Sequence, residues 1–74
     1  MDAEILKIAG EFRVILKQHR LYEQMTQKQV ADKIGISNQS YQAYEWGRTL
    51  PTMENFIKLC LLFDTTPNDL LGIK

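Results

Sequence analysis

The sequence predicts an all-α fold, a compact bundle of five helices, and two observations support this prediction. Apolar residues recur at helical spacing along almost the whole chain, and no segment shows the apolar–polar alternation of a strand. The 74 residues are 45% hydrophobic and include one cysteine, so the core is expected to form without a disulfide framework. We expect residues 1–74 to form one globular domain, with no separate ligand-sensing, protease or kinase domain.

The first helix is expected over residues 3–20. His19 falls on its core-facing side, and we interpret this lone histidine as a packing residue, not as a ligand or a catalyst. The helical spacing that predicts this face comes from Ile5, Ile8, Ala9, Phe12, Leu16 and His19.

Residues 26–47 predict two short helices joined by a tight turn. Thr26 caps the first helix, and Gln29 completes a capping box with it. Gly35 accepts the positive φ that a sharp turn requires, and Ser37 caps the second helix. The positions expected to face the core are Val30, Ala31, Ile34, Ile36, Tyr41 and Tyr44.

Two further helices are expected, over residues 52–63 and 66–72. Thr52 caps the first, and Pro67 stands at the first helical position of the second, which ends at Gly72. Cys60 is interpreted as a small buried hydrophobe in a reducing compartment. The inner side of the helix over residues 52–63 is expected to consist of Met53, Phe56, Ile57, Leu59, Cys60 and Phe63.

The helix pair over residues 26–47 has the layout of a helix-turn-helix, in which one helix braces across the DNA backbone and the next enters the major groove. The polar face of the second helix suits base edges, since Asn and Gln pair with adenine and an Ala methyl packs on thymine. The alternative, a solvated surface face, is disfavoured by the preceding helix and the glycine turn. The candidate base-reading residues are Asn38, Gln39, Ser40, Gln42 and Ala43.

These residues also resemble a known family, the phage lambda-type repressors and Cro proteins, also called the xenobiotic-response-element (XRE) family. The resemblance covers about residues 12–71 and implies a compact five-helix lambda-repressor-like DNA-binding domain. The matching residues are Thr26-Gln27, Val30-Ala31, Gly35-Ile36-Ser37, Tyr44-Glu45-x-Gly47, and Pro51 with the leucine-rich segment after it.

The resemblance implies a role for several further residues. Arg20 and Glu45 match a family ion pair that ties the first helix to the end of the recognition helix, so we expect Glu45 to be structural. Such a pair is costly to break on one side only. The residues that the resemblance places against the DNA backbone are Gln27, Lys28, Arg48 and Thr49.

Three residues depart from the family pattern. Trp46 replaces a small polar residue, and two roles stay open for it: packing on the sugar-phosphate backbone or covering the turn before Gly47. Tyr41 stands where an aliphatic residue is usual, so its hydroxyl must reach water or a partner. Gln24 replaces the usual Gly or Asn, which predicts a less tightly turned loop.

The net charge of zero is low for a domain that binds phosphates, but the charges are unevenly distributed. Residues 12–51 carry six basic and three acidic side chains, a balance of +3. Residues 1–11 carry −2 and residues 52–74 carry −1. The segment expected to face DNA is therefore positive. Because each subunit can make only a few ionic contacts with phosphates, we expect its affinity for DNA to depend strongly on dimerisation.

A homodimer interface is expected in the C-terminal part of the chain. Adjacent exposed apolar residues indicate an interface, and a dimer would set two recognition helices one DNA turn apart, roughly 34 Å. The alternative is that these residues pack on the N-terminal helix. The candidate interface residues are Leu61, Leu62, Leu71 and Ile73.

The sequence thus predicts a sequence-specific regulator, with a repressor as the first choice, that binds double-stranded DNA as a homodimer on an inverted repeat. The alternatives are an antitoxin or anti-repressor with a partner protein, and an interaction module that has lost DNA binding. An enzyme is disfavoured because the chain offers no plausible acid–base pair and no phosphate loop. We expect no cofactor, metal or small-molecule substrate, no membrane span, and a cytoplasmic location.

Overall fold

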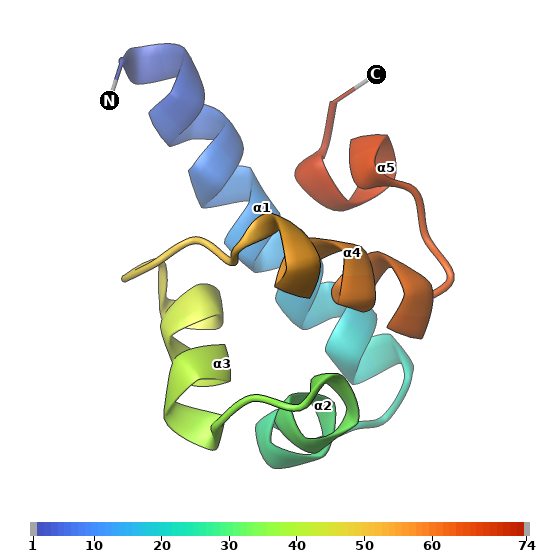
Figure 1. Ribbon diagram of the computed structural model, residues 1–74. Helices are drawn as coiled ribbons and strands as arrows, with labels where there is room; N and C mark the ends of the chain where they lie inside the picture. The colour runs from blue at the N-terminus through green and yellow to red at the C-terminus, as the bar shows by residue number, and fades with distance from the viewer. Residues whose placement is uncertain (1, 74) are drawn as a thin grey trace.

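A computed structural model describes residues 2–73, and five α-helices make up most of them. Figure 1 shows the long first helix running behind the fourth, the second and third helices together at one end, and the fifth beside the first. The described residues contain no strand, so the predicted all-α five-helix fold is confirmed. The helices are α1 (Ala3–Tyr22), α2 (Gln27–Ile34), α3 (Asn38–Trp46), α4 (Met53–Leu62) and α5 (Pro67–Leu71).

Every helix begins with a side-chain cap. In each case the capping oxygen accepts a hydrogen bond from the backbone N–H three residues further along, which satisfies a donor that the helix itself leaves free. Thr26 and Gln29 form the predicted capping box, with bonds of 3.1 and 2.8 Å in the two directions. The capping residues are Asp2, Thr26, Ser37, Thr52 and Thr66.

The loop after α1 differs from the expectation, because it turns tightly without a glycine. Gln24 adopts a left-handed φ of 57°. Its N–H donates to the carbonyl of Leu21 at 3.0 Å, and the N–H of Met25 donates to the carbonyl of Arg20 at 3.1 Å. These two bonds terminate α1 in the manner usual for a glycine, at the cost of a backbone conformation that L-residues disfavour.

The core is one cluster of buried side chains to which all five helices contribute. Phe12 and Leu16 of α1 meet Leu59 of α4, Leu70 of α5 and Tyr41 of α3, and each of these side chains is almost fully buried. This shared core joins the two motif helices and the two C-terminal helices to α1.

Two aromatic contacts extend this core along α1. The rings of Phe12 and Phe56 lie 6.0 Å apart, and His19 stacks on Phe63 at 5.6 Å. His19 is therefore a packing residue, as expected from the sequence. Cys60 is a buried free thiol whose pKa is raised by burial.

Three residues assigned to the inner faces are exposed instead. Met53 and Ile57 of α4 are 73% and 49% exposed, because the buried stripe of that helix is Leu59, Cys60 and the following Phe63. Ile5 is 46% exposed because the N-terminal turns of α1 project beyond the rest of the molecule (Figure 1). Helical spacing identified the correct faces, but it did not show how far each face is covered.

Candidate nucleic-acid interface

The two motif helices approach each other closely over a small side chain. Ala31 of α2 is fully buried and leaves room for α3. The turn between them closes through Gly35, whose φ is 76°, and through a 3.0 Å bond from the N–H of Ile36 to the carbonyl of Ala31. The turn between α2 and α3 is therefore closed by its own residues.

The predicted base-reading residues of α3 differ in how far their side chains are exposed. Gln39 and Ser40 are exposed, whereas Asn38, Gln42 and Ala43 are half-buried. Ser40 accepts a hydrogen bond from the hydroxyl of the cap Ser37 at 2.9 Å. The opposite face of α3 is buried and consists of Tyr41, Tyr44 and Glu45.

Asn38 begins this surface with an unusual feature. Its side-chain oxygen is buried, yet it has no hydrogen-bond partner among the described residues. Buried polar atoms without a partner are rare in folded proteins and call for a physical explanation. Asn38 is the first residue of a helix that otherwise presents amides and hydroxyls, and its side chain would have to rotate outward before this oxygen could meet a donor from outside the chain.

A buried ion pair anchors the recognition helix to α1. The Nε and Nη2 atoms of Arg20 donate to the two carboxylate oxygens of Glu45 at 2.6 and 3.0 Å, and Nη1 donates to the carbonyl of Met25 at 3.0 Å. Both side chains are at least nine-tenths buried. The ion pair implied by the family resemblance is therefore present in its bidentate form, which is the strongest geometry for such a pair.

Two more donors complete the cluster around Glu45. The Tyr41 hydroxyl donates to Oε2, and the side-chain amide of Gln27 donates to Oε1 at 3.1 Å. The hydroxyl of Tyr41 thus has the partner that its burial requires. Since Gln27 stands at the start of α2 and Glu45 near the end of α3, the cluster joins both motif helices to α1.

The cluster shifts the protonation equilibria of its members. Burial disfavours the Glu45 carboxylate, but the hydrogen bonds from Arg20, Tyr41 and Gln27 outweigh it and hold the pKa of Glu45 below its ordinary value. The hydrogen bond between Arg20 and Glu45 also raises the pKa of Arg20. Burial, reinforced by the Glu45 carboxylate, raises the pKa of the Tyr41 phenol. All three groups therefore keep one charge state near neutral pH.

The loop after α3 is organised by two arginines. The guanidinium of Arg48 lies 5.1 Å from the ring of Trp46, whose side chain is 54% exposed. Gly47 has a φ of 76°, and a Cβ atom there would come within 2.9 Å of the Cδ atom of Arg13. Arg13 thus lies against the turn at Gly47, whereas the two roles predicted for Trp46 both stay open.

The residues expected at the DNA backbone are gathered at the start of α2 and in the loop after α3. Gln27 is half-buried within the cluster, whereas Lys28 is exposed and pairs with Asp32 of the same helix at 3.1 Å. Arg48 and Thr49 are both exposed. The backbone N–H group of each donates a hydrogen bond to the carbonyl of Ala43. The bond from Gln27 to Glu45 brings the start of α2 to the C-terminal part of α3, which the loop with Arg48 and Thr49 follows.

The candidate dimer residues do not form one exposed patch, which corrects that expectation. Leu61 is 77% exposed and Ile73 38%, but Leu62 and Leu71 are partly buried against the core. Leu61 and Leu62 line a hollow next to α2, whereas Leu71 lines a different one next to α1. The close packing of α5 on α1 separates the two groups.

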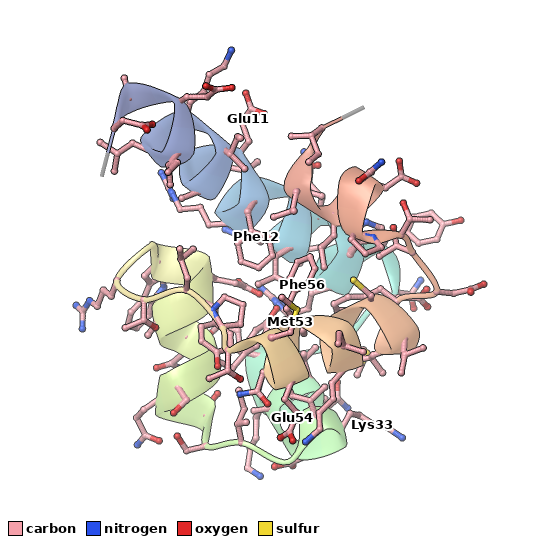
Figure 2. All side chains as sticks on the ribbon, turned by 45° about the horizontal axis from the view of Figure 1, so that its top comes forward. Glu11, Phe12, Lys33, Met53, Glu54 and Phe56 are labelled. Atoms are coloured by element: carbon pink, nitrogen blue, oxygen red, sulfur yellow. The ribbon has the colours of Figure 1, made fainter. Side chains whose placement is uncertain are left out.

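Of these two hollows, the one beside Leu71 has the larger apolar surface. It lies between the N-terminal half of α1, the start of α4 and α5, and Figure 2 shows Phe12, Phe56 and Met53 facing one another there. Its outer rim includes Ile5 and Leu50, both about half exposed. This surface was not identified from the sequence, because it needs the α3–α4 loop to fold back beside α1.

Two kinds of feature are absent from residues 2–73. No group of three or more His, Cys, Asp or Glu side chains is arranged there to hold a metal ion. None of the helices in this range is long and apolar enough to cross a membrane.

Comparison with known proteins agrees with this geometry. A helix-turn-helix family model matches residues 16–70, which include both motif helices and the whole cluster around Glu45. No solved structure shows a significant match to the chain.

The similar proteins include regulators from two bacteria. The cryptic phage CTXphi transcriptional repressor RstR of Vibrio cholerae is 49% identical over 47 residues, which span 64% of this chain and 42% of that protein. The uncharacterized HTH-type transcriptional regulator YobD of Bacillus subtilis is 34% identical over 58 residues, 78% of this chain and 52% of that protein. The HTH-type transcriptional regulator AnsR of the same bacterium is 45% identical over 42 residues, 57% and 36% respectively. The chain therefore spans about half the length of these relatives, or less.

Proposed function

This chain belongs to the XRE-type helix-turn-helix family of DNA-binding regulators, and we propose that it represses transcription by occupying a specific operator. The observation that supports this proposal most strongly is the buried cluster around Glu45, which holds α3 at a fixed angle while its polar face stays accessible. A rigid helix with free amides and hydroxyls is what direct reading of base edges requires.

Base reading is assigned to the accessible side of α3. Gln39 is exposed in the first turn of the helix, and its amide can donate to and accept from an adenine edge together. Asn38 is half-buried beside it, and rotation of its side chain would bring the unpartnered amide oxygen to the same surface. Ser40, Gln42 and Ala43 continue the same surface toward the centre of the helix.

Backbone contacts are assigned to the two ends of the motif. Gln27 and Lys28 stand at the N-terminal turn of α2, where free N–H groups and the helix dipole favour a phosphate. Trp46 is the last residue of α3, and Arg48 and Thr49 lie in the loop after it. Contacts of this kind position the protein on DNA but carry no sequence information.

Homodimer formation on an inverted repeat is part of the proposal. A single α3 offers too few base contacts to select one site in a genome, and a dimer doubles them at a spacing of roughly 34 Å. Exposed apolar side chains at Leu61 and around Met53 supply surfaces for self-association. RstR, which is named a repressor, is 49% identical to this chain over 47 residues.

The test is a selection of random duplex DNA against the purified protein at two salt concentrations. The proposal predicts that an inverted repeat is enriched at both. Its half-site spacing would give the separation of the recognition helices. Recovery of no motif at low salt would contradict sequence-specific binding and favour the alternative of a protein-interaction module on the same fold.

A further inference from the structure

The contact between Arg13 of α1 and Gly47 points to a binding residue outside the motif. The side chain of Arg13 crosses the turn after α3 so closely that a Cβ at Gly47 would lie 2.9 Å from Cδ and 3.4 Å from Nε. The side chain of Arg13 therefore lies against the loop that follows α3. Arg13 itself is exposed.

Arg13 and Arg48 line the same surface hollow. Its walls come from α1, from the end of α3 and from the loop, with Thr49 and Leu50 at its edge. Arg48 lies against the ring of Trp46, which limits where its guanidinium points. Two arginines from segments far apart in the sequence are thus brought to one place.

The charges of these two arginines have no ion-pair partner among the residues that the structure describes. None of the ion pairs formed within residues 2–73 includes Arg13 or Arg48. The neighbouring carboxylate, Glu45, is buried and already bound by Arg20. An external anion bound at this hollow would give both cations a counter-charge.

We propose that Arg13 and Arg48 together bind one phosphate of the DNA backbone beside the recognition helix, so that α1 contributes directly to DNA binding. The proposal rests on the proposed function for its ligand, and it adds a contact from a helix outside the helix-turn-helix motif. Arginine is suited to this role because its planar group binds phosphate oxygens in bidentate fashion. Gly47 allows this contact because a larger residue would displace the Arg13 side chain.

The test is the salt dependence of binding to random duplex DNA, which reports phosphate contacts without requiring a known operator. Each phosphate contact contributes about 0.9 to the slope of log K against log salt. Arg13→Gln is expected to reduce the magnitude of that slope by about 0.9, and Arg13→Lys is expected to retain it. Lys7→Gln is the matched control, because Lys7 is an exposed cation of the same helix that lies outside the hollow.

Three outcomes distinguish the possibilities. If Arg13→Gln reduces the magnitude of the slope and Lys7→Gln leaves it unchanged, Arg13 contacts a phosphate. If the two variants change the slope equally, Arg13 acts only through net charge and the inference is overturned while DNA binding stands. If the wild-type protein binds no DNA at low salt, both this inference and the proposed function are overturned. Circular dichroism melting of Arg13→Gln verifies that the variant is folded.

Discussion

Tyr41 and Glu45, one turn apart on α3, share a hydrogen bond at the point where Arg20 of α1 binds the same carboxylate oxygen. The tyrosine is fully buried and the glutamate is 5% exposed. The recognition helix is therefore tied to the scaffold by a saturated polar cluster as well as by apolar packing. A fully satisfied buried network of this kind fixes a geometry more narrowly than apolar contacts alone.

Tyr41→Phe tests the contribution of the hydroxyl. The ring keeps its packing, but Glu45 loses one donor, so the free energy of unfolding should fall by about 1.5–3 kcal/mol, as for hydrogen bonds to charged groups. Urea denaturation at pH 7 measures this change. Tyr22→Phe is the control, because Tyr22 is 85% exposed. Equal stabilities of the two variants would mean that the hydroxyl does not stabilise the fold.

The lowered pKa of Glu45 predicts a loss of stability in acid. Because the pKa is lower in the folded state than its ordinary value of 4.5, this group's contribution is fully present above pH 4.5. It is lost as the pH falls through the folded-state pKa. Urea denaturation at several pH values below 6 should show this decline.

Glu45→Gln separates this effect from the other carboxylates. The variant leaves the buried Arg20 without a counter-charge, which should cost about 3–5 kcal/mol at pH 7. Its stability should then decline less steeply than that of the wild type below pH 4.5. If the variant does not fold, Tyr41→Phe provides the second test, since it should shift the acid transition upward. Parallel pH profiles for wild type and both variants would contradict the assignment.

The left-handed Gln24 predicts a stabilising substitution. Gln24→Gly relieves an unfavourable φ of 57°, and part of that gain is offset by the greater freedom of glycine in the unfolded chain. We expect a net gain of about 0.5–1 kcal/mol, measured as a higher midpoint in thermal unfolding. Gln18 is an exposed residue within α1, away from both ends of the helix. Gln18→Gly should instead lower the free energy of unfolding by about 1 kcal/mol. Destabilisation by Gln24→Gly would show that the turn is not strained.

The oligomeric state tests the two exposed apolar surfaces. Leu61→Glu places a charge beside α2, and Met53→Glu places one at the hollow between α1 and α4. Both side chains are more than 70% exposed, so neither change should unfold the monomer. Light scattering of the wild-type protein should give the mass of a dimer, and one of the two variants should give that of a monomer. A monomeric wild type at high concentration would contradict the proposed homodimer.

The parts of the fold that local chemistry determines were predictable from the sequence. The caps at Thr26 and Ser37 and the turn at Gly35 follow from neighbouring residues alone, and the structure contains all three. The pairing of Arg20 with Glu45 spans 25 residues, and only the family resemblance implied it.

The parts that depend on packing between distant segments were not predictable. The exposure of Met53 depends on how α1 and α5 cover α4, and the contact of Arg13 with Gly47 depends on the crossing of α1 over a loop. The separation of Leu61 from Leu71 likewise follows from the docking of α5. Periodicity places a residue on a face but does not show what covers that face.

The central claim is that α3 reads base sequence, and Gln39→Ala tests it most directly. Fluorescence anisotropy would give the ratio of affinities for the selected operator and for a scrambled duplex, with Gln18→Ala, an exposed glutamine of α1, as the control. We expect Gln39→Ala to lower the affinity for the operator by about 1–3 kcal/mol while binding to the scrambled duplex stays unchanged. An equal loss on both duplexes, or none on either, would contradict base reading by this helix.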